Sequence, residues 1–350
     1  MKAILLAGGK GTRLRPLTLH TPKPIVPIFN RPFLHYQIDL LKQVPGLNEV
    51  ILSLNYQPRR IEDVFGDGRS VGLPIRYLVE PQPLGTGGAI KFTEPHLDGP
   101  VIVFNGDVLT EIDLNAVLAL HRSRKAKATI VLTPVDNPTA YGLVETAPDG
   151  TVQRFLEKPT PDEITTNNIN AGIYILEPDT FDRIPKDTPY SIERSYFPSL
   201  VERGETFVAY VYDGYWIDIG TPEKYTQVHR DIMSGAFSAI PFAGTKDAVI
   251  AEGAKIEDGA VVQGPCFIDE GTVVRSGARV EPYSVIGKDC HIEESAVVRG
   301  SIVWSGSWIG REALVDRAIV GRNAHVGRNA IVSPGRMLGD KSVLTDFTQA

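Results

Sequence analysis

Glycines and cations stand together near the start of the chain, in a pattern that could bind phosphate. The run is Gly8-Gly9-Lys10-Gly11-Thr12-Arg13, with Arg15 close behind. Backbone N–H groups of a glycine loop approach phosphate oxygens closely, and arginine neutralises their charge. The run lacks the third glycine of the dinucleotide fingerprint and the Gly-Lys-Ser/Thr ending of the Walker A loop. We therefore predict a phosphate-binding loop of another kind, lying between a strand and a helix.

A single lysine, Lys23, stands between Pro22 and Pro24. Proline fixes φ on both sides of the lysine and so holds its backbone rigid, which suits a charge that must meet a substrate in one place. The same run could also be an ordinary surface turn.

Carboxylates stand at the ends of other predicted elements. Asp107 closes Asn105-Gly106-Asp107, directly after an apolar run, and Asp218 precedes a helix-like segment. Asp218 could therefore be only a helix cap, and Glu157 could be a solvated surface carboxylate.

The order of these motifs resembles the nucleoside-diphosphate-sugar pyrophosphorylases, which are sugar-1-phosphate nucleotidyltransferases. The glycine–arginine run followed by Pro-Lys-Pro resembles their signature. Further segments match in order: Gln82-Pro83-Leu84-Gly85-Thr86-Gly87, Asn105-Gly106-Asp107, Tyr141-Gly142-Leu143-Val144-Glu145, Glu157-Lys158-Pro159, Asn170-Ala171-Gly172 and Trp216-Ile217-Asp218-Ile219-Gly220-Thr221-Pro222.

The resemblance implies a role for each matched residue. It places Arg13, Lys23 and Asp107 in catalysis, and Asp107 and Asp218 as ligands of a Mg²⁺ cofactor. The residues implied for nucleotide binding are Leu6, Ala7, Gly8, Gly9, Gly11, Thr12, Gln82, Gly85 and Thr86, with Gln82 offering the base both a donor and an acceptor. Those implied for the sugar phosphate are Gly142, Glu157, Lys158 and Asn170.

The implied reaction is attack by the sugar 1-phosphate on the α-phosphorus of a nucleoside triphosphate, with release of pyrophosphate. A phosphate monoester, with a second pKa of about 6, is mostly dianionic at neutral pH, so no general base is required. The site must instead gather two anions by positioning and charge neutralisation. Accordingly, the seven histidines show no local metal-ligand spacing and suggest no Ser/His/Asp arrangement.

The resemblance is strongest to the mannose-1-phosphate guanylyltransferase branch, which implies GTP and mannose 1-phosphate as substrates. A glucose-1-phosphate thymidylyl- or uridylyltransferase is the alternative. A non-catalytic subunit that senses sugar nucleotides is a further one, which Lys23, Asp107 and Asp218 argue against.

Short apolar runs alternate with helix-like segments over the first part of the chain. Residues 3–6, 50–52, 101–104 and 129–132 are typical of buried strands, and Phe33 to Val44 and Leu114 to Arg124 have helical spacing. The alternation predicts a mostly parallel, doubly wound α/β sheet; the family resemblance implies a Rossmann-like mixed sheet in a catalytic domain at 1–235. Ligands then lie beyond the carboxyl ends of the strands.

A period of six replaces this pattern in the second part of the chain. Every sixth residue from Ile250 to Trp304 is apolar, and each of the first eight is followed four residues later by a small one, including Cys266 and Cys290. After Trp304 the register slips to Ile309 and Val315, then again to Val320. One large and one small residue per unit predict a coil of short flat sides with tight corners.

The hexad resembles that of the left-handed parallel β-helix family, which gives a second domain at 245–350. We interpret both cysteines as packing residues and not as a disulfide framework. Because a prism ends in unpaired strand edges, we expect a homodimer or larger homo-oligomer through this domain. An acyltransferase activity of the β-helix, using His291 and His325, is the alternative use.

The amino-acid composition is that of an ordinary globular protein. With 350 residues, 42% hydrophobic, 22% charged and a net charge of -6, the chain is unlike nucleic-acid-binding, membrane and disordered proteins. The apolar run from Ala3 to Ala7 is too short for a signal peptide. We expect small-molecule substrates, no nucleic acid or membrane partner, and a cytoplasmic location.

Overall fold

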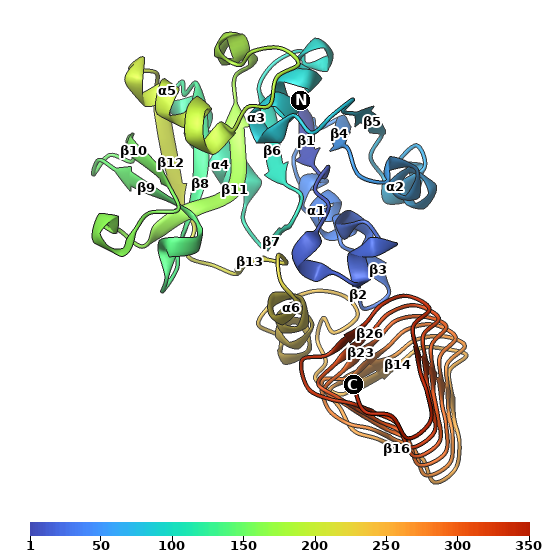
Figure 1. The fold of residues 1–350 in the computed structure, drawn as a ribbon. Coiled ribbons are helices and arrows are strands. Elements are labelled where there is room, and N and C mark those ends of the chain that lie inside the picture. Colours follow the sequence, from blue (N-terminus) through green and yellow to red (C-terminus); the bar gives the residue numbers. More distant parts are fainter. The chain divides into compact units, whose positions relative to one another are not determined.

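The computed structural model describes residues 1–350, which form two compact units (Figure 1). The first comprises Met1–Lys10 and Leu34–Asp218. The second comprises Gly11–Phe33 and Ile219–Ala350. The units do not follow the order of the sequence. Gly11–Phe33, which carries Arg13 and Lys23, belongs to the same unit as the C-terminal part of the chain.

The first unit is built on a nine-stranded sheet in the order β10-β9-β11-β6-β1-β4-β5, with β8 beside β11 and β12 beside β8. The strands are β1 (Lys2–Leu6), β4 (Glu49–Leu54), β5 (Ile75–Val79), β6 (Val101–Asn105), β8 (Ala128–Pro134), β9 (Gly142–Thr146), β10 (Val152–Glu157), β11 (Asn168–Leu176) and β12 (Phe207–Val211). The four predicted strands lie within β1, β4, β6 and β8, whose apolar side chains form the buried core.

Helices connect these strands and confirm an α/β fold. They are α1 (Leu34–Leu41), α2 (Pro58–Phe65), α3 (Gly85–Thr93), α4 (Leu114–Ser123) and α5 (Phe197–Glu202), while α6 (Pro222–Ser234) belongs to the second unit. The helices predicted at 33–44 and 114–124 are therefore present, the first of them shorter than predicted. None of the helices is long and apolar enough to cross a bilayer.

The sheet is more mixed than the strand–helix alternation predicts. β1 pairs in parallel with β4 and β6, but β11 pairs antiparallel with β6, β8 and β9. Apolar runs show which strands are buried on both faces, but they carry no information on strand direction. The mixed Rossmann-like sheet implied by the family resemblance is correct.

The glycine loop does not lead into an α-helix, contrary to the prediction. Three short 3₁₀-helices follow it, at Thr12–Leu14, Leu17–Leu19 and Lys23–Ile25, and then a ribbon of β2 (Pro27–Ile28) and β3 (Arg31–Pro32). Prolines at 16, 22, 24 and 27 lack the N–H donors that an α-helix needs, so the segment forms separate turns.

The second unit contains a β-helix of three parallel sheets, visible as stacked triangular coils (Figure 1). The first sheet has β14 (Ala248–Ile250), β17 (Cys266–Ile268), β20 (Val285–Ile286), β23 (Ile302–Val303), β26 (Ile319–Val320) and β29 (Met337–Leu338). The second has β15 (Lys255–Ile256), β18 (Val273–Val274), β21 (His291–Ile292), β24 (Trp308–Ile309), β27 (His325–Val326) and β30 (Val343–Leu344). The third has β16 (Val261–Val262), β19 (Arg279–Val280), β22 (Val297–Arg299), β25 (Leu314–Asp316) and β28 (Ile331–Val332).

The predicted hexad register is wrong by one residue at Trp304. Ile268 pairs with Ile286, 18 residues on, but Ile286 pairs with Val303, 17 residues on, so Val303 and not Trp304 fills the coil interior. The Trp304 side chain is buried elsewhere, because its Nε1 donates to the Tyr225 hydroxyl at 3.0 Å. The coils then continue regularly beyond Val332, to β30.

Both cysteines are buried and lie in the β-helix core, as predicted. Burial raises the pKa of each thiol to about 12, so both remain protonated near neutral pH. They act as small apolar residues at the corners of the coil.

Candidate functional site

The turn that carries Asp107 lies against the end of β1. β1 and β6 are parallel neighbours, so Leu6 stands opposite Asn105 and both strands end at the same edge. The N–H of Gly106 donates to the carbonyl of Leu6 at 3.0 Å. A Cβ at position 106 would lie 2.4 Å from that carbonyl oxygen, so only glycine permits this approach.

A buried glutamine that the motifs did not indicate fixes the same turn. Gln37 on α1 donates from Nε2 to the carbonyls of Asn105, at 2.9 Å, and Val108, at 2.8 Å. These two bonds hold the backbone on both sides of Asp107. The only signal in the sequence is a polar residue within an apolar helix face, which is too weak to single it out.

A short ribbon brings Asp218 to Asp107. β13 (Trp216–Asp218) pairs antiparallel with β7 (Val108–Thr110), and Asp218 stands opposite Val108. The Tyr141 hydroxyl donates to Oδ1 of Asp218 at 3.1 Å. The two predicted magnesium ligands are therefore neighbours within the first unit.

Asp218 is not the cap of the helix that follows it. α6 begins at Pro222, and the side chain of Thr221 accepts the capping hydrogen bond from the N–H of Lys224. The Asp218 carboxylate therefore has no capping role in α6.

The segments predicted to bind the sugar phosphate lie side by side on β9 and β10. Gly142 stands opposite Glu157, and a Cβ on Gly142 would lie 3.0 Å from Glu157 Oε2. The next residue, Lys158, is exposed, and its N–H donates to the carbonyl of Tyr141 at 2.9 Å. The backbone of Lys158 is therefore hydrogen-bonded to Tyr141, the residue whose hydroxyl contacts Asp218.

Asn170 joins this group from β11. Its side-chain oxygen accepts from the N–H of Gly172 at 2.9 Å, and its Nδ2 donates to the Tyr174 hydroxyl at 2.9 Å. The Trp216 Nε1 donates to the carbonyl of Ala171 at 2.9 Å. A Cβ on Gly172 would lie 2.9 Å from the Asn105 side chain. The Asn170-Ala171-Gly172 segment therefore connects the sugar-phosphate segments to the turn that carries Asp107.

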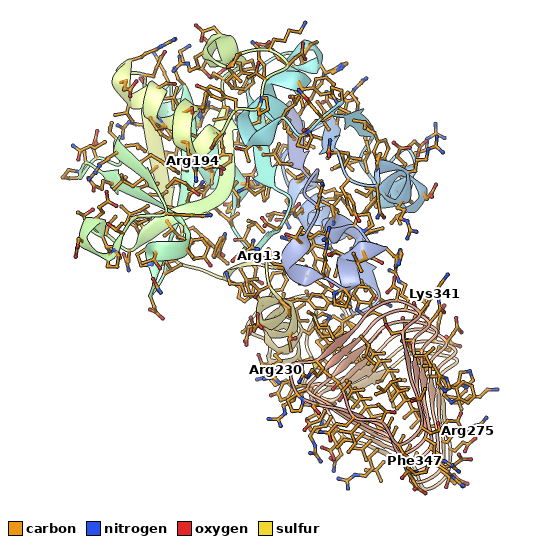
Figure 2. All side chains as sticks on the ribbon, in the orientation of Figure 1. Arg13, Arg194, Arg230, Arg275, Lys341 and Phe347 are labelled. Carbon is orange, nitrogen blue, oxygen red and sulfur yellow. The ribbon has the colours of Figure 1, made fainter.

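Glu157 is not a freely solvated carboxylate. Burial raises its pKa, the charge of Glu193 raises it further, and Lys158 and Arg194 act in the opposite direction. Glu193 and Arg194 come from the π-helix Ile192–Tyr196, and Figure 2 shows Arg194 on this part of the chain. Neither residue was predicted, because nothing in the local pattern marks them.

The loop predicted to receive the base is held at both ends. Glu80, which is buried, accepts from Ser53 Oγ at 2.9 Å and from the N–H of Leu84 at 2.9 Å. Thr86 Oγ1 donates to Glu193 at 2.8 Å and accepts from the N–H of Ile192 at 2.9 Å. These two bonds fix the Thr86 side chain to the π-helix segment at Ile192 and Glu193.

Gln82, in the middle of that loop, is exposed. Its amide group is accordingly open to a base. The Ala7-Gly8-Gly9 strand end lies nearby, since a Cβ on Gly8 would be 3.4 Å from Glu80 Oε1. The predicted phosphate and base contacts of the first unit are therefore neighbours.

The predicted cations lie in the second unit. Gly11 has φ of 60°, and a Cβ there would be 3.2 Å from the Lys23 Cβ, so this glycine allows the two turns to approach closely. Arg13 is exposed, whereas Lys23 is only 9% exposed. Because Lys23 is buried, the Pro22-Lys23-Pro24 run is not an ordinary surface turn. Arg13 and Lys23 belong to one unit and Asp107 and Asp218 to the other, and their convergence on one substrate stays a prediction.

Comparison with known proteins assigns both parts of the chain. Residues 2–235 match the Nucleotidyl transferase family, and residues 245–349 match the left-handed β-helix (LbH) domain of EIF2B subunit epsilon. Mannose-1-phosphate guanylyltransferase from Mycobacterium tuberculosis is 40% identical over 272 residues, covering 77% of this chain and 75% of that one. UTP–glucose-1-phosphate uridylyltransferase from Synechocystis sp. is 34% identical over 304 residues, covering 77% and 78%.

Solved structures show the same likeness for the first part of the chain. HddC from Yersinia pseudotuberculosis is 33% identical with a TM-score of 0.56, and the match covers 65% of this chain and 96% of HddC. HddC complexed with GMP-PN matches with a TM-score of 0.55 over the same shares.

Proposed function

From the premise that this chain belongs to the Nucleotidyl transferase family, we propose that it transfers the guanylyl group of GTP to mannose 1-phosphate. The products are GDP-mannose and pyrophosphate. The observation that carries the choice of substrates is the 40% identity to a mannose-1-phosphate guanylyltransferase across both parts of the chain. The likeness to HddC, which has been solved with GMP-PN, also favours a guanine nucleotide.

The chemistry needs no proton acceptor. A phosphate oxygen of mannose 1-phosphate forms a bond to the α-phosphorus of GTP, and the bond from that phosphorus to the β-phosphate oxygen breaks. Arg13 and Lys23 neutralise the triphosphate, and Lys158 binds the incoming phosphate. Glu157 and Asn170 bind the sugar hydroxyls, while Gln82 binds the base and the backbone from Leu6 to Thr12 carries the phosphates.

Asp107 and Asp218 fit a Mg²⁺ ion by their donor chemistry. Both are carboxylates, the preferred protein ligands of Mg²⁺, and the β7–β13 ribbon places them next to each other. The structure has no group of three or more acidic, histidine or cysteine side chains that could hold a metal. A two-carboxylate site of this kind leaves the remaining positions to water and substrate phosphates, as Mg²⁺ sites usually do. When bound, the ion supplies charge neutralisation at the phosphates.

The reaction is tested by pyrophosphate exchange with a panel of sugar nucleotides. We expect exchange with GDP-mannose that depends on Mg²⁺. Exchange with dTDP-glucose or UDP-glucose but not GDP-mannose would overturn the choice of substrates and keep the reaction class. No exchange with any sugar nucleotide would favour a non-catalytic sensor subunit.

A uridylyltransferase acting on glucose 1-phosphate is the second candidate. It is favoured by the 34% identity to the Synechocystis enzyme over similar shares of both chains. We rank it lower because this identity is smaller than that to the guanylyltransferase. The ratio of kcat/KM for GTP with mannose 1-phosphate to that for UTP with glucose 1-phosphate decides between them.

We further propose that the protein is a cytoplasmic homo-oligomer that binds neither nucleic acid nor membrane. Support comes from both ends of the β-helix, where apolar side chains are exposed. Ile250 and Val261 lie on the first coil, and Val343 and Phe347 lie on the last (Figure 2 labels Phe347). A monodisperse monomer at micromolar concentration in solution scattering would contradict the oligomer.

An acyltransferase activity that uses His291 and His325 stays the alternative use of the β-helix. The imidazole of His291 stacks on Trp308 at 4.5 Å between ring centroids.

A further inference from the structure

The segment that carries Arg13 and Lys23 folds into short 3₁₀ turns and not into a longer helix. The first and third turns are each closed by two i to i+3 bonds, which in the third turn run from Ile25 N–H to Pro22 O at 2.9 Å and from Val26 N–H to Lys23 O at 3.1 Å. Even so, every residue from 21 to 26 is buried. Something outside the segment must therefore hold it in place.

The first external anchor is at Thr21, two residues before Lys23. The hydroxyl of Thr21 accepts from Arg322 Nη1 at 3.0 Å and donates to Asp340 Oδ2 at 3.4 Å. Asp340 also accepts from the N–H of Arg322 at 2.9 Å, which fixes the two β-helix residues to each other. Thr21 is fully buried, so a lost bond there cannot be replaced by bulk water.

The second anchor is on the other side of Lys23, at Pro27 and Phe29. The Tyr225 hydroxyl, on α6, donates to the carbonyl of Pro27 and accepts from Trp304 Nε1 at 3.0 Å. The N–H of Phe29 donates to His229 Nε2 at 3.2 Å, also on α6. The turn at Lys23 thus lies between two anchored points.

Trp304 connects the two anchors. The Arg322 guanidinium lies over its ring, 5.3 Å from the centroid, while its Nε1 bonds to Tyr225. This arrangement explains why the coil turns Trp304 outward and fills its interior with Val303. All these contacts lie within the second unit.

We propose that Trp304, Arg322 and Asp340 of the β-helix are positioning residues for Lys23, acting through Thr21 and Pro27. The inference rests on the proposed role of Lys23 in guanylyl transfer. On this proposal the β-helix contributes to catalysis, because its contacts fix the position at which the Lys23 ammonium meets the triphosphate.

The β-helix itself provides a matched control one corner further along. Residues 321–324 and 327–330 are both Gly-Arg-Asn-Ala. The N–H of Arg328 donates to Asp346 Oδ1 at 2.9 Å, and its guanidinium lies 5.0 Å from the Phe347 ring centroid. Arg328 and Asp346 thus repeat the local contacts of Arg322 and Asp340, but neither is hydrogen-bonded to the segment from Gly11 to Phe33.

The test compares Arg322→Ala with Arg328→Ala in the full-length protein. We expect Arg322→Ala to lower kcat about tenfold while the KM for mannose 1-phosphate changes less than about twofold. Arg328→Ala should keep both values within about twofold of wild type. Equal kcat in the two variants, at matched thermal unfolding midpoints and oligomeric state, would overturn the inference.

A conservative pair at the other partner separates positioning from loss of fold. Thr21→Val removes the hydroxyl and should lower kcat as Arg322→Ala does, whereas Thr21→Ser keeps the hydroxyl and should restore most of it. In the double variant of Thr21→Val and Arg322→Ala, the losses should not add, because both remove one interaction. Additive losses would contradict the proposal that Arg322 acts through Thr21.

A readout without turnover distinguishes failure of this inference from failure of the proposed function. The rate at which an amine-acylating reagent modifies Lys23 is followed by mass spectrometry. It should rise severalfold in Arg322→Ala and stay unchanged in Arg328→Ala, even if the wild type proves to use another substrate. Unchanged Lys23 labelling in both variants would overturn the proposed positioning of Lys23 by the β-helix. If the wild type does not use GTP and mannose 1-phosphate, only the proposed function is overturned.

Discussion

The predicted carboxylates and the predicted cations are held in place by different means. Asp218 lies on β13 and Asp107 directly precedes β7, so the pairing of these two strands brings the carboxylates together. Arg13 and Lys23 lie in a proline-rich segment of single turns, which side chains from α6 and the β-helix hold from outside. The difference indicates that the cation side should respond to changes in the β-helix, whereas the carboxylate side should respond to changes within the first unit.

The largest effect is expected at Lys23, for which we propose direct contact with the reacting phosphates. Lys23→Ala should lower kcat about a hundredfold or more and weaken substrate binding far less, because its charge matters most in the transition state. The measurement is steady-state kinetics of pyrophosphate release. Near-normal turnover would show that Lys23 takes no part in the mechanism. The comparison between the carboxylates and the cations would then no longer concern catalysis.

Asp107→Asn and Asp218→Asn test the carboxylate side. Each should lower kcat about a hundredfold at a fixed Mg²⁺ concentration, with partial recovery as Mg²⁺ is raised, because each removes one charged ligand. Asp136→Asn, on an exposed loop, serves as the matched control. An unaltered Mg²⁺ dependence in both variants would show that these carboxylates do not hold the ion.

The α6 anchor should make the cation side sensitive to acid. Burial lowers the pKa of His229 to about 4, although the hydrogen bond of its Nδ1 to the carbonyl of Tyr225 acts in the other direction. The unfolded chain therefore takes up this proton first. Stability from the neutral imidazole is complete above about pH 6.5 and is lost as the pH falls from there to about 4, by about 3 kcal/mol at most.

His229→Gln sharpens this prediction, because an amide does not titrate and can replace both hydrogen bonds. The free energy of unfolding, measured by denaturant titration at several pH values, should depend less on pH in this variant between pH 6.5 and 4. Equal slopes for wild type and variant would assign the acid sensitivity to other groups.

The smallest effect is expected at Tyr141, whose hydroxyl donates to Asp218. Tyr141→Phe should raise the Mg²⁺ concentration for half-maximal activity a few-fold, in keeping with one lost hydrogen bond. Tyr77→Phe loses a bond to the Gly66 carbonyl elsewhere in the first unit and is the control. A shift as large as that of Asp218→Asn would instead place the Tyr141 hydroxyl among the groups that contact substrate or metal.

Local and periodic features could be predicted from the amino-acid sequence. The order of motifs marked the glycine loop, Lys23 and both aspartates, and the hexads identified the β-helix with one error at Trp304. A period of six and a buried apolar run are imposed by hydrogen bonding and burial over a few residues, so they are legible in one chain.

The partners of these residues could not be predicted from the sequence and became known from the fold. The pairing of Asp218 with Val108, the support of the Asp107 turn by Gln37 and the antiparallel direction of β11 have no periodic trace in the sequence. Arg322 reaches Thr21 across 301 residues of chain. Such contacts form because folding brings distant segments together, and a single sequence does not encode the distance between them in any local pattern.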